Sequence, residues 1–332
     1  MSTPSYFPSG VKAPFFIGGG GSSNKFAGMW TNGIWFVDGT LGLDSNDGTS
    51  PDRAVATVNR ALTLAGIHDT IYIKPKINLV GWCDLDPRWA SGFAETYVEN
   101  ITVGASNDSS KKQGISIIGT GNGYNVSGCP VQMKGVVGVN KPTIDMWANN
   151  INVENIQFGF AAAQTGYGVV RIKSGSLPDT DQGLAFGCTV NNCFFEQCTS
   201  NNAVFVIESS AGNLIEGCTF DTCRYAIIVS SNSSASDSNV IRGNHFTGLA
   251  ASIGAGIVTG DCDDIFIIGN VFGYVAPTGY SPFCYFSSAG TCADGVFAFN
   301  IEGDSSTAIA DHHALSGVKP MANFGRNGLL ST

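Results

Sequence analysis

The hexapeptide Ile215-Glu-Gly-Cys-Thr-Phe220 decides the fold, because four other stretches of the chain repeat its pattern. Each stretch has a β-branched aliphatic residue five positions before a phenylalanine, and Asn or Gly three positions before it. The other four are Val153-Glu-Asn-Ile-Gln-Phe158, Val190-Asn-Asn-Cys-Phe-Phe195, Ile241-Arg-Gly-Asn-His-Phe246 and Ile267-Ile-Gly-Asn-Val-Phe272. Successive phenylalanines lie 37, 25, 26 and 26 residues apart. A fixed period in this range is typical of a solenoid.

The repeated unit reads as a strand, a one-residue bend and a second strand. Asn and Gly suit the bend because they reach left-handed backbone angles at the least cost. One unit cannot bury its apolar face alone, so units stack and share a core. Strand-like runs lie upstream of the repeats, at 203–207, 226–229, 256–258 and 296–299. The period therefore predicts an all-β coil of three short strands and three turns.

Stacked coils lie about 4.8 Å apart, so residues at equivalent positions touch one another. The phenylalanines are predicted to form an inner wall. Two positions before them, Asn side chains are predicted to hydrogen-bond along the stack at a bend, with Cys substituting in some coils. A third column, at Cys198, Cys223, Leu249 and Val275, is predicted to be core. The predicted structural ladder is Cys193, Cys218, Asn244, Asn270, Phe195, Phe220, Phe246 and Phe272.

Composition narrows the function classes. The chain has 332 residues, of which 43% are hydrophobic and 13% charged, and 43 are glycine. The charged share is about half the usual quarter, as in an all-β protein with many tight turns. A net charge of −9 argues against a nucleic-acid partner, and no apolar run is long enough to span a membrane.

The ten cysteines are expected to be free buried thiols, because the N-terminus lacks a basic region and an apolar region typical of a signal peptide. Cys284 and Cys292 flank a glycine-bearing loop and are the pair most open to a disulfide. No Cys or His spacing indicates a metal site, and no motif indicates a cofactor.

Four segments are expected. Residues 1–33 are an N-terminal attachment or assembly segment with glycines 18–21 as a hinge, 34–76 a cap, 77–304 the coils, and 305–332 a C-terminal cap or assembly tail. In the cap, Ser50 and Pro51 are predicted to start a short helix whose apolar face covers the open end of the solenoid.

The cap motifs carry a resemblance to a known family. They are Trp35-Phe-Val-Asp-Gly39, Asp44-Ser-Asn-Asp-Gly-Thr-Ser-Pro51, Asp69-Thr-Ile-Tyr-Ile73, Tyr97-Val-Glu-Asn-Ile-Thr-Val103 and Ile117-Ile-Gly-Thr-Gly121. Residues 34–304 resemble pectate-lyase-like right-handed parallel β-helix proteins, of the kind found in bacteriophage tailspikes, head fibres and decoration proteins. A long loop at 77–94 departs from that pattern. The resemblance implies a right-handed parallel β-helix and a homotrimer.

Two acidic stretches have both a catalytic or metal interpretation and a structural one. Asp261, Asp263 and Asp264 form the one tight acidic cluster of the repeats, and paired carboxylates act as acid and base on glycosidic bonds. They also occupy a polar turn, where Asp is common for backbone reasons, and this interpretation is preferred. Asp44-Ser-Asn-Asp-Gly48 lacks the ligand spacing of a calcium loop and is predicted to be a turn.

Two further groups of residues each have more than one interpretation. Trp82 and Trp89, with Asp84, Asp86 and Arg88, suit a glycan contact, since aromatic faces and carboxylates match sugar rings; packing of the tryptophans against the coils is the alternative. The pair His312-His313 lacks a third partner and is interpreted as part of a solvated or interfacial tail.

The sequence therefore favours a bacteriophage virion structural protein, assembled in the host cytoplasm, that presents a rigid β-helix on the particle surface. Its expected partners are further copies of itself, other virion proteins through residues 1–33, and a host glycan. No residue is assigned a catalytic role. The alternative is a polysaccharide lyase or glycoside hydrolase on the same scaffold.

Overall fold

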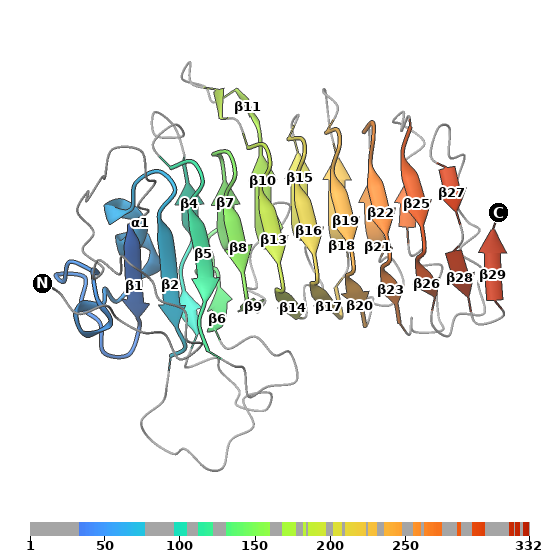
Figure 1. Ribbon diagram of the computed structural model, residues 1–332. Helices are drawn as coiled ribbons and strands as arrows, with labels where there is room; N and C mark the ends of the chain where they lie inside the picture. Colours follow the sequence, from blue (N-terminus) through green and yellow to red (C-terminus); the bar gives the residue numbers. More distant parts are fainter. Residues whose placement is uncertain are drawn as a thin grey trace, which may run out of the picture.

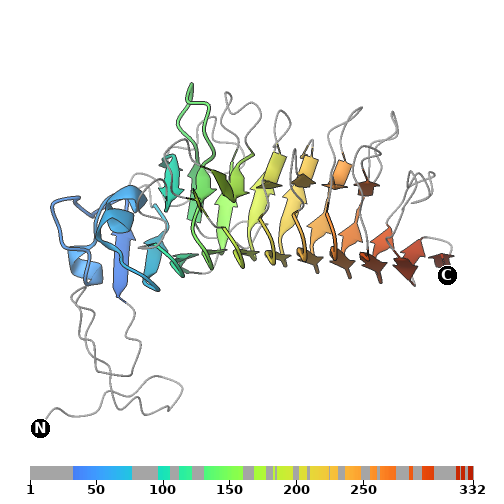
Figure 2. The ribbon, with the colours of Figure 1, turned by 90° about the horizontal axis from the view of Figure 1, so that it is seen from above.

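The computed structural model describes residues 33–76, 96–104, 112–121, 131–159, 168–176, 182–183, 185–196, 202–207, 210–223, 225–230, 236–247, 255–259, 262–273, 284–286, 294–302, 319–321, 323–325 and 328–331. These residues form a right-handed parallel β-helix, as predicted. Figures 1 and 2 show an elongated stack of coils with β1 at one end and β29 at the other.

Three sheets run along the stack, and between β3 and β26 each coil contributes one strand to each sheet in turn. Sheet 1 contains β1 (Ile34–Asp38), β2 (Thr70–Lys74), β5 (Ser116–Gly119), β8 (Asn152–Glu154), β13 (Thr189–Asn191), β16 (Leu214–Glu216), β19 (Val240–Arg242), β22 (Phe266–Ile268), β25 (Val296–Ala298) and β27 (Lys319–Met321). Sheet 2 contains β3 (Tyr97–Val98), β6 (Val131–Lys134), β9 (Ile156–Phe158), β14 (Phe194–Glu196), β17 (Thr219–Asp221), β20 (His245–Phe246), β23 (Val271–Phe272), β26 (Ile301–Glu302), β28 (Asn323–Gly325) and β29 (Gly328–Ser331). Sheet 3 contains β4 (Ile101–Val103), β7 (Ile144–Met146), β10 (Val170–Lys173), β15 (Asn202–Ile207), β18 (Tyr225–Ser230), β21 (Ala255–Thr259) and β24 (Cys284–Phe286).

Strands of successive coils pair in parallel, and a short antiparallel hairpin, β11 (Gly175–Ser176) with β12 (Gln182–Gly183), projects from the stack. The last pair of sheet 2, β28 with β29, is also antiparallel.

Two bends of each coil use left-handed backbone angles. The predicted bend, between sheets 1 and 2, has positive φ at Asn155, Asn192, Gly217, Gly243 and Gly269. A second such bend, just before sheet 1, was not predicted. Its residues with positive φ are His68, Gly114, Asn150, Gly187, Gly212, Ser238, Asp264 and Asp294. The coil is therefore shaped at both ends of sheet 1 by residues that tolerate this conformation.

The phenylalanine column is the centre of the core. Phe158, Phe195, Phe220, Phe246 and Phe272 are at most 2% exposed and stack in order. Their successive ring centroids lie 5.1, 5.0, 5.0 and 4.6 Å apart, with interplanar angles between 7° and 16°. The predicted register is confirmed, and the β-branched residues form an adjacent buried wall along sheet 1.

The cap contains the predicted helix, but its start was misplaced. Pro51–Arg53 is a separate turn of 3₁₀ helix, and α1 spans Val58–Leu64 with Thr57 as its N-cap. The Thr57 side chain accepts the N–H of Arg60 at 3.1 Å. The chain between the two helices is held extended, because Val55 forms a parallel bridge to Val37 in β1. The buried face of α1 is the predicted one.

One predicted strand belongs to a different sheet. Residues 296–299 were assigned to the strand upstream of the repeats, which is sheet 3, yet β25 lies in sheet 1 beside β22. It opens a sixth repeat in which Glu302 takes the register position of the phenylalanine. Glu302 breaks the pattern by which the other units were found. Among the described residues, no helix is long and apolar enough to cross a membrane.

Candidate functional site

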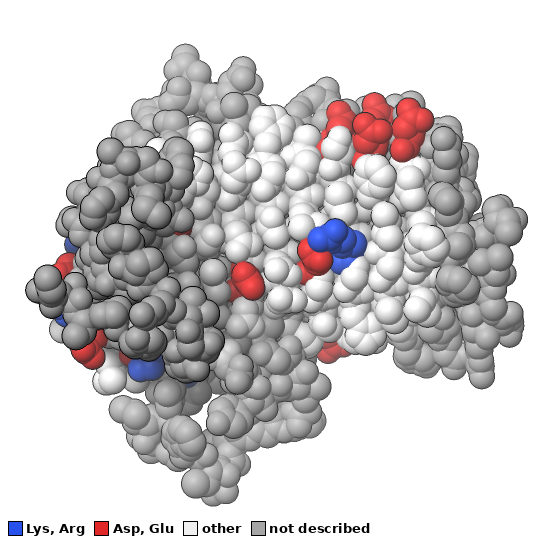
Figure 3. Space-filling model, viewed as in Figure 1, with Lys and Arg blue, Asp and Glu red and all other residues white. Residues whose placement is uncertain are grey.

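The outer face of sheet 1 toward the C-terminal coils is the candidate site. Side chains alternate along each short strand, so the first and third residues of β16, β19 and β22 point outward while the middle residue is buried. The outward residues are Leu214, Glu216, Val240, Arg242, Phe266 and Ile268. Figure 3 shows this face as a broad surface that carries few charges.

One ion pair crosses the face. Arg242 Nη2 lies 2.9 Å from Glu216 Oε2 of the preceding coil, and both side chains are substantially exposed. The hydrogen bond to Glu216 raises the pKa of Arg242 above its usual value. Exposed pairs of this kind contribute little to stability, so the pair mainly leaves the face electrically neutral.

An acidic row borders the face at the bend before sheet 1. Asp237, Asp263, Asp264 and Asp294 lie there, and Asp264 and Asp294 are exposed with positive φ. Asp237 Oδ1 accepts the backbone N–H of Asp263 at 2.9 Å. The structure thus places Asp263 and Asp264 in a turn, while Asp261 lies outside the described residues. Figure 3 shows acidic groups along the upper right edge, over β19 to β25.

At the opposite end of the same strands, the bend toward sheet 2 changes character in the last coil. Phe299 occupies the position at which the earlier coils have Asn or Gly. Its φ is 55° and its side chain is 54% exposed. Ile301 beside it is 48% exposed. Sequence reasoning missed both residues, because it had assigned 296–299 to another sheet.

A buried ion pair lies on the outward side of sheet 3. Arg171 donates from Nε to Asp145 Oδ1 at 2.7 Å and from Nη2 to Asp145 Oδ2 at 2.5 Å, and both residues are under 9% exposed. The guanidinium carbon of Arg171 lies 5.7 Å, and Lys173 Nζ 4.8 Å, from the ring centre of Trp147. The two carboxylate oxygens are occupied by the bidentate arginine, so this cluster holds two coils together.

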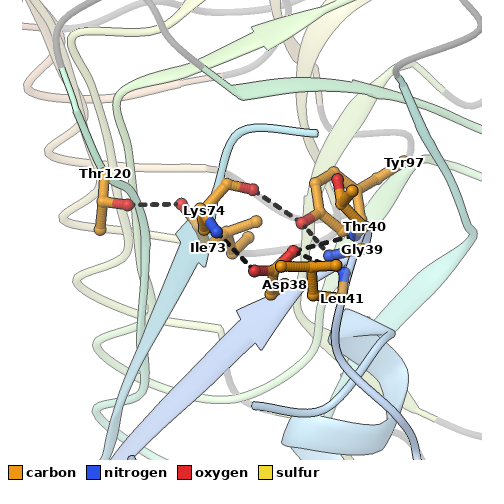
Figure 4. Close-up of polar contacts among 8 residues, drawn as sticks. All are labelled: Asp38, Gly39, Thr40, Leu41, Ile73, Lys74, Tyr97 and Thr120. Atoms are coloured by element: carbon orange, nitrogen blue, oxygen red, sulfur yellow. Dashed lines mark hydrogen bonds and ion pairs between the residues drawn. The ribbon is translucent and has the colours of Figure 1, made fainter. Parts of the chain in front are cut away.

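A polar cluster fixes the cap to the first coils (Figure 4). The Tyr97 hydroxyl donates to Lys74 O and accepts the N–H of Gly39, both at 2.7 Å. Lys74 Nζ donates to Asp38 Oδ2 at 2.6 Å. Burial raises the pKa of Asp38, but the hydrogen bonds from Lys74 and from two backbone N–H groups outweigh it, so the pKa is lowered overall. Burial raises the pKa of Tyr97.

The turn interpretation of residues 44–48 agrees with the contacts of Asp44. Its Oδ1 accepts the N–H groups of Ala56 and Thr57, both at 2.9 Å. This carboxylate therefore helps to hold the chain at the start of α1.

The inner corner of the C-terminal coils contains the predicted amide ladder, formed by Asn244, Asn270 and Asn300. Asn270 Oδ1 accepts both the backbone N–H and the side-chain Nδ2 of Asn244 at 3.0 Å, and Asn300 Oδ1 does the same for Asn270. The ladder ends at Cys218, whose N–H donates to Asn244 Oδ1 at 2.9 Å. Cys193 occupies the next position in the column and is buried.

A second ladder of the same design was missed. It lies seven residues before Phe195, Phe220 and Phe246, at the other end of sheet 1. Asn239 Oδ1 accepts from the backbone and side chain of Asn213 at 3.1 and 2.9 Å, and Asn213 Oδ1 accepts the N–H of Cys188 at 2.9 Å. The repeated Asn at this spacing is the signal that could have revealed it.

Five cysteines whose side chains are described, Cys188, Cys193, Cys218, Cys223 and Cys262, are buried thiols rather than halves of a disulfide. Cys188 Sγ donates to Ala148 O at 3.3 Å, and Cys218 Sγ to Glu216 O at 3.4 Å. Burial raises the pKa of Cys188 to about 12 and that of Cys193 well above its usual value. These thiols are structural parts of the core.

Several predicted residues lie outside the described part of the chain. They are Trp82, Asp84, Asp86, Arg88, Trp89, Cys198, Leu249, Val275, Cys292, His312 and His313. Cys284 lies in β24, and nothing is described of its side chain. The glycan contact and the 284–292 pairing therefore stay predictions.

Comparison with known proteins gives one family and several similar structures. A family described as periplasmic copper-binding protein (NosD) matches residues 96–288. No curated protein matches the chain. A lacto-N-biosidase from Eubacterium ramulus is 13% identical over 88% of this chain and 55% of its own, with a TM-score of 0.47.

Two further solved structures are similar at the same level. The surface adhesin PfbA of Streptococcus pneumoniae is 13% identical over 89% of this chain and 79% of its own, with a TM-score of 0.46. A rhamnogalacturonan lyase is 12% identical over 87% of each chain, with a TM-score of 0.40. This chain spans just over half the length of the lacto-N-biosidase. Since the family match covers more than half of the residues, the chain belongs to the NosD family of right-handed parallel β-helix proteins.

Proposed function

We propose that this chain is a structural protein of a bacteriophage particle, a head decoration protein, fibre or tailspike-like component. In this proposal the β-helix is a stiff body that presents its faces on the particle surface, and residues 1–33 attach it. A homotrimer located in the virion, with a host glycan as a further partner, completes the proposal.

The observation that supports a mechanical role is the uninterrupted packing along the stack. Five phenylalanine rings lie within 5.1 Å of their neighbours, centre to centre, over five successive coils. Two amide ladders run beside them through buried space. Satisfied buried amide networks rigidify a core, so the coils resist bending and slipping relative to one another.

The acidic groups of the cap also serve the fold. Glu99 accepts the N–H groups of Val58 and Asn59 at 3.0 and 2.9 Å, which caps α1. Asp69 accepts from Gly33 N, Trp35 Nε1 and Gly66 N at 2.6 to 2.8 Å. Each carboxylate joins separate segments of the chain and so helps to hold the cap on the first coils.

The family description raises the question of copper, for which thiolates and imidazoles are suitable ligands. The described thiols do not fit such a site, because burial raises the pKa of Cys188 and Cys193 and so opposes the thiolate form. Among the described residues, no group of three or more His, Cys, Asp or Glu side chains is placed to hold a metal ion. The proposal therefore assigns no role to copper.

Incorporation into particles tests the proposal. Phage particles are purified by density-gradient centrifugation from a host that produces this chain, and labelled antibodies against the chain are located by electron microscopy. Regular labelling at fixed positions on the particle is expected. A variant that lacks residues 1–33 is expected to stay in the soluble fraction. Absence of the wild-type chain from purified particles would refute the virion role.

A polysaccharide-degrading activity is the competing outcome. The purified chain is incubated with bacterial surface polysaccharides, and chain length and unsaturated-uronate absorbance are followed. No cleavage is expected. Cleavage that disappears in the variant Asp261→Asn, Asp263→Asn, Asp264→Asn would make the enzyme the better assignment. Cleavage retained by that variant would move the search to Trp82 and Trp89.

A further inference from the structure

A partly exposed apolar patch wraps around the bend between sheets 1 and 2 in the last coils. Phe266 pairs in register with Val296, and Val271 with Ile301, so these four side chains form two adjacent rows. Ile268 and Phe299 lie between the rows, at the bend. We call Phe266, Ile268, Val271, Val296, Phe299 and Ile301 the apolar corner; the last two are 54% and 48% exposed.

Phe299 is an unusual residue for its position. A bulky side chain with positive φ is a genuine backbone outlier, and the same bend carries Asn or Gly in five earlier coils. Strained residues of this kind are concentrated at functional sites. Neither burial nor local backbone preference explains Phe299, whereas a partner that covers the ring does.

The apolar corner and the acidic row form one surface. Asp264 precedes β22 by two residues and Ile268 ends it, so the acidic row lies at one end of the strand and the apolar corner at the other. At about 3.3 Å per residue, Asp264 and Ile268 are separated by about 13 Å. A matching partner therefore combines large apolar side chains with basic groups at that distance.

The chain itself contains such a partner segment. Residues 1–33 hold six aromatic residues, Tyr6, Phe7, Phe15, Phe16, Phe26 and Trp30, and two lysines, and they contain no Asp or Glu. Lys12 and Phe16 are four residues apart, a span of about 13 Å in an extended chain. Charge, apolar character and spacing all match the surface.

We propose that the apolar corner and the acidic row bind residues 1–33 of a second copy of this chain. The surface is at the far end of sheet 1 from β1, seven strand positions away, which is about 34 Å. Lys25 lies nine residues before Ile34 and reaches at most about 32 Å from it. Its own chain brings Lys25 near β22 only when the linking residues are fully extended, whereas a second copy brings the whole segment without that restriction.

This contact joins two different surfaces of the same protein, so copies associate head to tail and either close into a ring or extend. The inference does not rest on the virion role. It predicts self-association of the purified chain in the absence of any other particle protein.

Two full-length variants test the contact. The first is Phe299→Asn, which removes the exposed ring and installs the residue found at this bend in earlier coils. The second is Lys12→Glu with Lys25→Glu, which reverses the charge of the segment. Sedimentation velocity over a range of concentrations is expected to show association of the wild type, weakened by added salt, and at least about tenfold weaker association of each variant.

Mixing the two variants separates a contact between copies from one within a copy. One variant keeps an intact segment and the other keeps an intact surface, so an equimolar mixture is expected to form a one-to-one dimer with about the wild-type affinity. The matched control is Leu41→Asn, which removes a 69% exposed side chain in the cap and is expected to leave association unchanged.

Fold integrity is checked by thermal unfolding, in which Phe299→Asn is expected to be at least as stable as the wild type because Asn tolerates positive φ. A wild type that stays monomeric at every concentration, variants that associate normally, or a mixture that stays monomeric would each overturn the proposal.

Discussion

At the residue scale, the amide ladders explain why polar side chains occupy the interior of this solenoid. Each Asn supplies one acceptor to the coil before it and one donor to a backbone carbonyl, as Asn270 does with Ile241 O at 3.0 Å. The bend leaves backbone groups without partners in its own coil, and the amides satisfy them from the next coil. Apolar residues of similar size cannot do this.

Replacing one ladder residue should therefore lower the free energy of unfolding by more than the loss of side-chain volume alone would. Asn270→Ala removes the acceptor of both the backbone N–H and the side-chain amide of buried Asn244, so the free energy of unfolding should fall by about 2–5 kcal/mol. Asn270→Cys should cost less. At the equivalent position two coils earlier, the thiol of Cys218 donates to the carbonyl oxygen of Val190. Urea unfolding of both variants measures the difference. Equal losses would show that the donor to Ile241 is unimportant.

The buried thiols make stability sensitive to alkaline pH. The pKa of Cys188 is raised by burial from 9.0 to about 12, so the unfolded chain loses this proton first. The stabilising contribution is complete below pH 9 and is lost as pH rises toward 12. In that range the free energy of unfolding should fall by up to about 1.4 kcal/mol per pH unit.

Denaturant unfolding from pH 7 to pH 11 tests this contribution, with Cys188→Ala as the control. The variant should be less stable at neutral pH but show a shallower decline. An identical pH profile in both proteins would contradict the assignment to Cys188.

The residues found from sequence were those attached to the phenylalanine pattern. Asn244 and Asn270 lie two positions before it, inside an obvious repeat. Asn213 and Asn239 form the same kind of hydrogen bonds between coils. They lie seven positions before the phenylalanine, in a polar stretch that resembles any loop. Phe299 was missed for a physical reason, because an aromatic residue in a strand-like run gives no sign of a left-handed backbone.

At the element scale, the phenylalanine stack joins five successive coils through the centre of the core. Phe220 is fully buried between two parallel rings, whereas Phe266 points outward from sheet 1 and is half-buried. The two residues therefore provide a matched pair for substitution within one scaffold.

Phe220→Ala should lower the free energy of unfolding by about 3–5 kcal/mol, because it opens a cavity between two rings. Phe266→Ala should cost far less, because its side chain is only partly buried. Chemical denaturation of the two variants decides the point. Similar losses would mean that the outward face is packed as tightly as the core.

The cap shows how far local sequence rules extend. The apolar face of α1 followed from helical spacing, and its burial is as expected. The start of α1 was not predicted correctly. Ser50 and Pro51 have the pattern of a helix start, yet they begin only a 3₁₀ turn. The bridge between Val55 and Val37 is a contact across 18 residues, and local preference has no information about it.

At the scale of the whole molecule, the fold was predictable because one signal recurs in five successive coils. The glycan contact at Trp82 and Trp89 remains a prediction, since those residues are outside the described chain. The apolar corner was not predictable from the repeat, because it arises where the pattern changes, at Phe299 and Glu302.

Because each coil contacts chiefly its neighbours, damage should stay local. Phe272→Ala should increase amide hydrogen exchange in β22, β23, β25 and β26 while leaving β1, β2 and α1 protected. Mass spectrometry of peptic peptides measures both regions in one experiment, with Leu41→Asn as a control for a surface change. Uniform acceleration along the chain would show that the solenoid unfolds as a single cooperative unit.

The equal spacing of the rings has a consequence for how such a gene changes over time. A recombination event that duplicates or deletes one in-phase block of 26 residues, such as 221–246, would give each ring, amide and bend on either side of the junction an equivalent neighbour. The product would be longer or shorter by about 4.8 Å with its register intact. The length of the β-helix can therefore change by whole coils during evolution, independently of what its two ends bind.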